Sequence, residues 1–334
     1  MYETFFGLSG KPFQLNPDPA FFYGSRGHKR AFAYLQYGVH QGEGFIIITG
    51  EVGAGKTTLV RSLLEQIDPS RLVAAQLVTT QLDAEDLLRA VALAFGLSTK
   101  AMDKAQLLAE LAAFLVSLVP QGKRALLIVD EAQNLSGRAI EELRMLSNFQ
   151  LGSQGLLQSF LVGQPELRQL MQGPDLQQLR QRVTASYHLG PMDRGETQEY
   201  VEHRLRHVGW SNLPQFSPGA FDAIYTFSAG IPRRINTLCN RVLLAAALSE
   251  EHDITAPNVD ATADEIRLEL SEGSGGPATG TVNADIHDFE EGEPAVGLEQ
   301  RVVRLERAMT ATLDLLQQMR RSQTPLKPLD PLNN

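Results

Sequence analysis

Residues 44–61 read GFIIITGEVGAGKTTLVR: a short apolar run, a glycine-rich loop, and a stretch with helical spacing. Residues 50–57 fit the pattern G-x-x-x-x-G-K-T, whose backbone N–H groups bind phosphate oxygens. Gly50, Gly53 and Gly55 let the backbone curl around a phosphate without Cβ clashes, and the following helix adds its dipole and free N–H groups. A strand before the loop and a helix after it predict a nucleotide-binding site, not a chance glycine turn.

We expect this loop and the residue after it to supply the main contacts to the phosphates. Lys56 is predicted to reach the β and γ phosphates, and Thr57 is predicted to ligate Mg²⁺. The predicted contacts to the nucleotide are Gly50, Glu51, Val52, Gly53, Ala54, Gly55, Lys56, Thr57 and Thr58.

A second motif, ALLIVDEAQNL at residues 125–135, supplies acidic residues. Its apolar run brings Asp130 to the C-terminal end of a strand, where α/β proteins bind ligands, and we expect Asp130 to hold Mg²⁺ through water. Glu131 follows directly and is predicted to polarise the attacking water, which favours hydrolysis. The alternative is a pair of exposed loop acids, and their pairing with the glycine loop favours the functional interpretation.

Gln164, Arg180 and Arg182 each have two interpretations. Gln164 follows a predicted strand at residues 156–162, and it either senses the γ phosphate or caps the helix that starts at Pro165. Arg180 and Arg182 end a predicted helix, and an arginine there can project into a neighbouring subunit's site as a finger. A basic, solvated helix end is the alternative, and the sequence alone slightly favours it.

Residues 230–236, GIPRRIN, begin another predicted helix. Arg233 and Arg234 lie in its first turn, where the helix dipole disfavours cations. A nucleotide phosphate contacted from a second domain would explain them, and surface arginines are the alternative. Charge arguments do not choose between the two residues.

Alternating apolar strands and helices up to residue 190 predict a parallel sheet covered by helices. The predicted strands lie at the apolar run before the glycine loop and at residues 73–78, 124–129, 156–162 and 185–189, and the helices at 28–40, 56–67, 83–95, 104–119 and 138–149. Four further helices, at residues 194–208, 218–228, 231–248 and 256–270, have no predicted strand between them. The expected domains are therefore an α/β domain at residues 1–190 and a small all-helical domain at residues 191–270.

The C-terminal part of the chain has a different composition. Residues 271–297 are rich in glycine and acids, which predicts a flexible linker. Residues 298–321 carry apolar side chains in steps of three and four, which predicts a short coiled coil that oligomerises or binds a partner. The alternative is a lone amphipathic helix packed on its own domain. Residues 322–334 are expected to be a disordered tail.

The 334 residues carry a net charge of −9 and contain a single cysteine, Cys239. An internal disulfide is excluded, which suits a reducing compartment. The acidic balance excludes a uniformly basic nucleic-acid-binding surface but leaves room for a local basic patch. The sequence shows neither a signal peptide nor an apolar run of about 18 residues, so we expect a cytoplasmic protein whose membrane contact, if any, is peripheral.

Together the glycine loop, DEAQNL at residues 130–135 and LVGQPELRQL at residues 161–170 resemble AAA+ ATPases. Residues 1–61 are more specifically similar to the ExeA/GspA-type secretion ATPases, above all to the branch associated with exosortase (PEP-CTERM) and exopolysaccharide loci. The resemblance extends over residues 1–270. It implies a five-stranded P-loop core with a helical lid, Walker A at residues 50–57 and Walker B at Asp130–Glu131.

The resemblance also implies roles for the open positions. Gln164 falls at the sensor-1 position, where Asn, Ser or Thr is more usual. Arg182 matches the finger position, and Arg233 matches the sensor-2 arginine. The aromatic segment at residues 13–23 would help to enclose adenine, with plain packing onto the core as the alternative.

The implied function is hydrolysis of ATP to ADP and phosphate, with ATP and Mg²⁺ bound between core and lid. A homo-oligomer would pass the lid movement to a protein partner in envelope export or sorting. Unlike the ExeA type, the sequence shows no transmembrane or peptidoglycan-binding segment after the lid, which disfavours direct remodelling of peptidoglycan. Two alternatives are a DNA-linked AAA+ ATPase of the transposition-regulator type, against which the acidic tail weighs, and a non-hydrolysing nucleotide switch or scaffold.

Overall fold

The computed structural model describes residues 2–78, 82–152 and 154–273, which belong to one compact unit. The predicted coiled coil, the tail and most of the predicted linker lie outside these residues. The last helix, α12 (Ala256–Gly273), includes the first three residues of the predicted linker.

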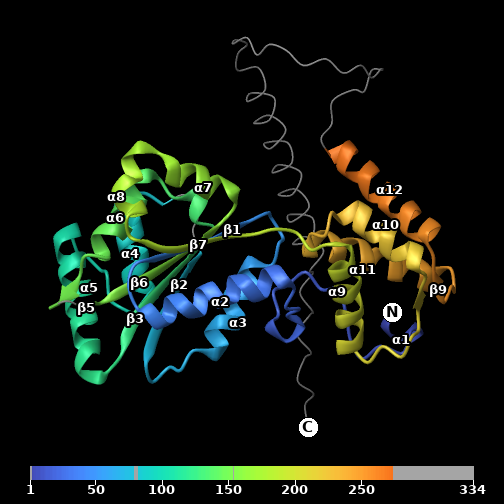
Figure 1. The fold of residues 1–334 in the computed structure, drawn as a ribbon, viewed down its shortest axis with the longest axis horizontal. Coiled ribbons are helices and arrows are strands. Elements are labelled where there is room, and N and C mark those ends of the chain that lie inside the picture. Colours follow the sequence, from blue (N-terminus) through green and yellow to red (C-terminus); the bar gives the residue numbers. More distant parts are fainter. Residues whose placement is uncertain (1, 79–81, 153, 274–334) are drawn as a thin grey trace, which may run out of the picture. The chain divides into compact units, whose positions relative to one another are not determined.

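A five-stranded, wholly parallel sheet forms the centre of the α/β part of the fold (Figure 1), as the sequence predicted. Its order is β2-β3-β6-β1-β7. The strands are β1 (Phe45–Gly50), β2 (Leu72–Val78), β3 (Arg124–Asp130), β6 (Leu157–Gly163) and β7 (Val183–Leu189). Because β6 lies between β1 and β3, the loops after these three strands meet at one end of the sheet, which we call its carboxyl end.

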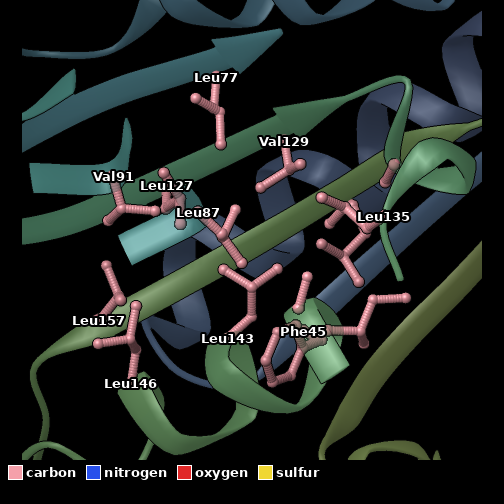
Figure 2. Close-up of a cluster of buried hydrophobic side chains, with 14 of the residues drawn as sticks. Phe45, Leu77, Leu87, Val91, Leu127, Val129, Leu135, Leu143, Leu146 and Leu157 are labelled. Carbon is pink, nitrogen blue, oxygen red and sulfur yellow. The ribbon is translucent and has the colours of Figure 1, made fainter. Parts of the chain in front are cut away.

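Helices cover both faces of the sheet. They are α2 (Arg26–Gln41), α3 (Lys56–Gln66), α4 (Ala84–Ala94), α5 (Lys104–Leu118), α6 (Gly137–Leu146), α7 (Pro165–Gln172) and α8 (Gln177–Arg180). Alternate side chains of a strand point to opposite faces, and β1 follows this rule: Ile46 and Ile48 pack with α2 and α3, whereas Phe45 and Ile47 pack with α4 to α8. Figure 2 shows the second cluster, in which Phe45 lies among leucines from strands and helices. Burial on both faces explains why the central strands read as continuous apolar runs.

Short elements connect these helices and strands. They are the 3-10 turns η2 (Val119–Gln121), η3 (Ala132–Asn134) and η4 (Pro174–Leu176) and the antiparallel pair β4 (Gln150–Leu151) and β5 (Gln154–Gly155). The sequence did not predict β4 and β5. The predicted helix at residues 138–149 ends at Leu146 because this pair follows it.

The second group of helices, which we call the lid, consists of α9 (Arg194–His207), α10 (Pro218–Ser228), α11 (Pro232–Leu248) and α12. The prediction that this domain has no strand is wrong, because β8 (Gln215–Phe216) pairs in parallel with β9 (Asp253–Ile254). Two residues per strand are too few to produce a periodic pattern in the sequence. Cys239 is fully buried in the lid core, and burial raises the pKa of its thiol.

The N-terminal segment packs mainly with the lid, although Phe22 packs with the cluster between the sheet and the helices α2 and α3. It contains α1 (Tyr2–Phe5) and the 3-10 turn η1 (Pro19–Phe21). Tyr2, Phe6, Phe13 and Phe21 are buried in the same hydrophobic cluster as the lid helices. This differs from the expected boundary at residue 190, which placed the segment in the α/β domain.

Candidate nucleotide-binding site

The phosphate loop, residues 50–57, connects β1 to α3 at the carboxyl end of the sheet. Gly53 and Gly55 have φ values of +81° and +95°, in the left-handed region that favours glycine. A Cβ at Gly53 would lie 2.3 Å from Arg233 Cβ, and one at Gly55 would lie 2.8 Å from His28 Nε2. The loop therefore needs these glycines for its curvature and also for close contacts with other elements.

Lys56 lies buried beneath the loop. Its Nζ donates hydrogen bonds to the carbonyl oxygens of Gly50 (2.7 Å) and Glu51 (3.0 Å). Burial lowers the pKa of Lys56, and the nearby charges of Glu131 and Asp130 oppose that shift. Lys56 thus lies where an arriving phosphate can replace neutral carbonyl partners by a charged one.

Thr57 and Asp130 are in direct contact, as a shared metal site requires. Thr57 Oγ1 donates a hydrogen bond to Asp130 Oδ2 at 2.9 Å. A hydroxyl and a carboxylate are ligands that fit Mg²⁺, which is usually held by one or two protein groups together with substrate phosphates and water. Burial raises the pKa of Asp130, and the Thr57 hydrogen bond opposes the shift. The two residues fit the metal that the sequence predicts.

Glu131 adopts a left-handed backbone conformation, with φ 53° and ψ 39°, which is uncommon outside glycine and concentrates at functional sites. Its Oε2 accepts hydrogen bonds from Gln133 Nε2 (2.7 Å) and Gln164 Nε2 (3.0 Å). Burial opposes ionisation of Glu131, but these two hydrogen bonds and the charge of Lys56 outweigh it and lower its pKa. The carboxylate is therefore ionised at neutral pH and able to accept a proton.

Gln164 stands at the N-cap position of α7, but its side chain makes no capping hydrogen bond. It points to Glu131 instead, and its backbone N–H donates to Gln133 Oε1 at 2.9 Å. The capping alternative therefore does not describe the Gln164 side chain, and sensing of the γ phosphate stays a prediction. Gln133 was not predicted, and the only signal for it was its place in DEAQNL.

Arg180 and Arg182 do not reach the phosphate loop of their own chain. Arg182 directly precedes β7, whose first residue pairs with Phe45, so it lies at the opposite, amino end of the sheet. Its Nη1 donates to the carbonyl oxygen (3.2 Å) and the Oγ (3.0 Å) of Ser147.

Arg180 has a different environment. Its Nη1 donates to the carbonyl oxygens of Met171 and Gly173, both at 2.7 Å, at the C-terminal end of α7. A cation is favoured there by the helix dipole. This geometry matches the structural interpretation for Arg180 and leaves Arg182 as the candidate finger.

A cavity of about 320 Å³ opens beside the phosphate loop. It is lined by residues of the phosphate loop and the start of α3, by the segment at residues 14–18, and by residues of the lid. Besides that segment, the lining residues are Val52, Gly53, Gly55, Lys56, Thr57, Thr58, Glu131, Tyr200, Arg204, Pro232, Arg233 and Asn236. Arg233 also donates its backbone N–H to the Gly53 carbonyl at 3.1 Å, whereas Arg234 is not part of the lining. The structure therefore separates two arginines that charge arguments could not.

Arg204, which the sequence did not flag, is buried beside this cavity. Its guanidinium donates to the carbonyl oxygens of Pro12 and Gln14 and to Tyr200 Oη, and it lies 4.8 Å from the centre of the Phe21 ring. Within the described residues it forms no ion pair with a carboxylate. Arg204 fixes the N-terminal segment so that residues 14–18 line the cavity.

This arrangement bears on the expected role of residues 13–23. Phe13 and Phe21 are buried in the lid cluster, and neither lines the cavity. The packing alternative therefore describes these aromatic side chains, although they pack on the lid and not on the α/β core. The part of the segment that faces the cavity is the polar stretch between them.

His28 is a second residue that the sequence analysis missed. It lies buried in the first turn of α2, with its Nε2 3.0 Å from the Ala54 carbonyl oxygen of the phosphate loop. The sequence separates the two residues by 26 positions, so no local pattern could connect them.

These features define an α/β P-loop fold of the AAA type: the sheet order, the phosphate loop after β1 and the acidic pair after β3. Residues 39–171 match the AAA domain family. Over 275 residues the chain is 40% identical to general secretion pathway protein A of Aeromonas hydrophila. The aligned region covers 82% of this chain and 50% of that protein. The chain thus spans about half the length of this relative.

Solved structures agree on the fold. The ORC2 protein of Aeropyrum pernix, in ADPNP–ADP complexes, aligns with a TM-score of 0.59 and 18% identity over 77% of this chain and 72% of that one. Drosophila ORC bound to DNA aligns with a TM-score of 0.59 and 17% identity over 82% of this chain and 67% of that one. Identities this low support the fold alone. In the described part of the chain, no helix combines the length and the apolar character that a membrane span requires.

Proposed function

We propose that the protein binds ATP with Mg²⁺ in the cavity beside the phosphate loop and hydrolyses it to ADP and phosphate. The observation that carries this proposal is the contact between Thr57 and Asp130, with Glu131, bonded to Gln133 and Gln164, as the next residue. Phosphoryl transfer to water requires groups that hold Mg²⁺, a cation beside the phosphates and a base for the water. At one end of the sheet, Thr57 with Asp130, the buried Lys56 and Glu131 would supply these groups.

Each group has a step to perform. Lys56 exchanges its bonds with the Gly50 and Glu51 carbonyls for the β and γ phosphates. Thr57 and Asp130 would hold Mg²⁺, which supplies positive charge to the phosphates. Glu131 accepts the proton of the attacking water, and Gln133 and Gln164 hold its carboxylate in place from one side.

Two arginines act from outside the core. Arg233, in the first turn of α11, lines the cavity and would contact phosphate from the lid, as a sensor-2 arginine does. Arg182 lies too far away to act in its own chain, so its role as a finger requires a neighbouring copy. We therefore propose a homo-oligomer whose site is complete only when a second chain supplies Arg182.

We further propose that ATP turnover serves an envelope export or sorting system through a protein partner. The 40% identity to general secretion pathway protein A supports this. The exosortase and exopolysaccharide branch rests on the resemblance of residues 1–61 alone. We propose a cytoplasmic location, in which any membrane contact is peripheral.

The test compares Glu131→Gln with Lys56→Ala, measuring ATP hydrolysis and binding of a fluorescent ATP analogue for each. We expect Glu131→Gln to bind the analogue while its hydrolysis falls on the order of 10²-fold or more, and Lys56→Ala to lose both. Unchanged hydrolysis in Glu131→Gln would contradict the proposed role of Glu131. Wild-type binding without any turnover would favour the non-hydrolysing switch. Titrating DNA at several salt concentrations tests the DNA-linked alternative, because phosphate contacts produce a steep salt dependence.

A further inference from the structure

The first turn of α2 contacts the phosphate loop and the lid within four residues. Ser25 is the N-cap of α2, and its Oγ accepts a hydrogen bond from the backbone N–H of His28 at 3.3 Å. The same oxygen lies 2.7 Å from His28 Nδ1. The carbonyl oxygen of Ala54 can only accept, whereas Ser25 Oγ has a hydrogen that it can donate to Nδ1. The other ring nitrogen, Nε2, then carries the hydrogen of the neutral ring and donates it to the Ala54 carbonyl oxygen.

The charge state of His28 agrees with this assignment. Burial lowers the pKa of His28, and the hydrogen bond to the Ala54 carbonyl and the charge of Glu196 oppose the shift. A neutral ring with one donor and one acceptor satisfies both neighbours, and burial favours the neutral ring over the charged one.

The bond to Ala54 fixes the direction of the next N–H group. In a trans peptide the carbonyl and the following N–H point in opposite directions. A carbonyl of Ala54 held toward His28 therefore directs the N–H of Gly55 away from His28. Gly55 lines the cavity in which the phosphates are proposed to bind.

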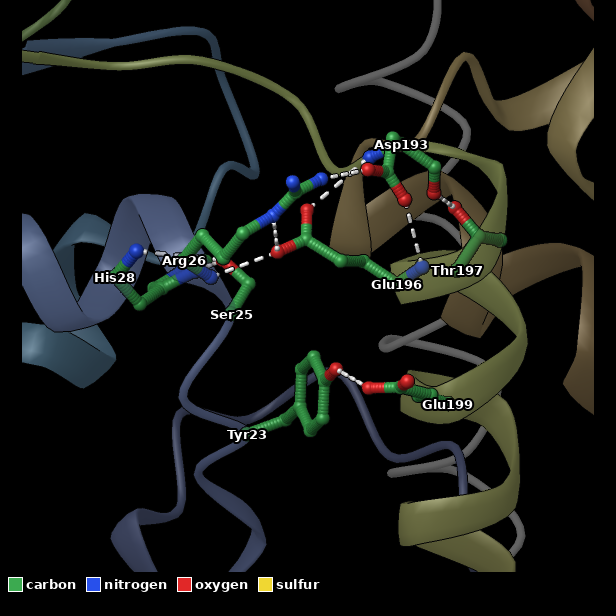
Figure 3. Close-up of polar contacts among 8 residues, drawn as sticks. All are labelled: Tyr23, Ser25, Arg26, His28, Asp193, Glu196, Thr197 and Glu199. Atoms are coloured by element: carbon green, nitrogen blue, oxygen red, sulfur yellow. Dashed lines mark hydrogen bonds and ion pairs between the residues drawn. The ribbon is translucent and has the colours of Figure 1, made fainter.

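On the other side of the turn, Glu196 bonds to Arg26, the first residue of α2. Its Oε1 accepts the backbone N–H of Arg26 at 2.7 Å and the Nε at 3.2 Å, and Asp193 also pairs with the guanidinium (Figure 3). Glu196 Oε2 accepts the backbone N–H of Asp193 at 3.3 Å, within the capping box of α9. One carboxylate thus caps the N-termini of a core helix and a lid helix, which both helix dipoles favour.

The contact with the backbone is the shortest hydrogen bond from Glu196 to this turn, at 2.7 Å. The Arg26 side chain is 77% exposed, whereas the Glu196 side chain is 13% exposed. An exposed ion pair contributes little by itself, so the bond from Glu196 to the Arg26 N–H carries the connection.

We infer that residues 25–28 form a joint between the phosphate loop and the lid: His28 positions the loop through Ala54, and Glu196 fixes the lid to the same helical turn. His28 is therefore a positioning residue for phosphate binding, and the position of the lid depends on the conformation of the loop. This inference rests on the proposed binding of nucleotide at the phosphate loop.

Two matched variants test the role of His28. In His28→Gln the amide nitrogen takes the place of Nε2 and keeps the donor to Ala54, whereas in His28→Asn the amide oxygen takes the place of Nδ1 and keeps only the contact with Ser25. We expect His28→Gln to bind a fluorescent ATP analogue within about threefold of wild type, and His28→Asn to bind it about tenfold more weakly. Thermal unfolding without nucleotide shows whether both variants fold. Equal losses in the two variants, or no loss in His28→Asn, would overturn the positioning role.

A double-mutant cycle tests the joint. If the turn couples loop and lid, the affinity losses of His28→Asn and Glu196→Ala are not independent, and the double variant loses less than the product of the two factors. Glu199→Ala is the control, because Glu199 also lies on α9 and bonds to the N-terminal segment through Tyr23 Oη at 2.5 Å but does not touch the turn. Its loss should multiply with that of His28→Asn.

The outcomes separate this inference from the proposed function. If the affinity losses of His28→Asn and Glu196→Ala multiply as fully as those of His28→Asn and Glu199→Ala, the joint is overturned. A wild-type chain that binds no nucleotide would overturn the proposed function and the inference with it. Normal wild-type binding with a multiplicative cycle overturns the inference alone.

Discussion

The two ends of the five-stranded sheet hold their polar side chains in different ways. At the carboxyl end, Thr57, Asp130, Glu131 and Gln164 form hydrogen-bonded pairs between loops that follow three neighbouring strands. At the amino end, within the described residues, the guanidinium of Arg182 bonds to Ser147 alone, through a carbonyl and a hydroxyl. One chain thus assembles the proposed metal and base residues, but holds its proposed finger with neutral partners only.

The difference between the two ends explains how a nucleotide site can depend on a second copy of the chain. Hydrogen bonds from arginine to neutral acceptors are weaker than those to phosphate oxygens. In the proposed oligomer, Arg182 would therefore exchange Ser147 for a phosphate of the neighbouring site at little cost. The carboxyl end has no such freedom, because Asp130 is buried and bonded within its own chain.

The largest expected effect is at the amino end. Arg182→Ala should lower hydrolysis by about 10³-fold and leave nucleotide binding intact, because a finger stabilises the transition state from the neighbouring chain. Steady-state ATP hydrolysis and analogue binding measure the two quantities. Mixing Arg182→Ala with Glu131→Gln should restore part of the activity, since one chain keeps the base and the other keeps the finger. Absence of any recovery would contradict action between chains.

The next effect is at the carboxyl end. Asp130→Asn should lower hydrolysis on the order of 10²-fold and raise the Mg²⁺ concentration needed for half-maximal rate, because asparagine keeps an acceptor for Thr57 but loses the charge. Rates measured across a Mg²⁺ titration, with chelator added to define zero, give both values. An unchanged Mg²⁺ dependence would show that Asp130 does not hold the metal.

A smaller effect is expected at Gln164. Gln164→Ala should reduce hydrolysis by about tenfold and move the acidic limb of the pH–rate profile to higher pH. The sign follows from the hydrogen bond, which lowers the pKa of Glu131: without it the carboxylate takes up a proton at higher pH and stops acting as a base. An acidic limb that stays in place would separate Gln164 from Glu131.

The smallest effect sharpens the contrast between the two arginines. Arg180→Ala should cost about 1 kcal/mol of stability, because it loses hydrogen bonds to two carbonyls at the end of α7, and should leave kcat unchanged. Urea unfolding and steady-state hydrolysis test the two statements. A loss of activity as large as that of Arg182→Ala would transfer the finger role to Arg180.

Sequence patterns predicted the carboxyl end well, because its residues lie in local motifs. The apolar runs before Gly50 and Asp130 mark buried strands, and such strands end at the same edge of a parallel sheet. Gln164 was found for the same reason. The predicted start of β7 is two residues later than its observed start at Val183. This strand lies at the edge of the sheet, and its alternating burial gives a weak apolar pattern in the sequence.

Contacts between distant segments could not be predicted. Arg204 bonds to carbonyl groups about 190 residues earlier in the chain, and no periodic pattern in the sequence of α9 indicates this contact. The same holds for His28 beneath the phosphate loop and for the aromatic residues that join the lid core. Arg233 and Arg234 are equivalent as charges, and only the contact of the first turn of α11 with the phosphate loop separates them.

Cys239 has a practical consequence for measuring lid movement. It is the single cysteine of the 334 residues, and full burial with a raised thiol pKa makes it unreactive in the folded chain. A cysteine introduced on an exposed surface position would therefore be the one thiol that a dye labels, without first removing the native one. Two such positions, one on α2 and one on α10, would let energy transfer between dyes follow the lid through a cycle of nucleotide binding and release.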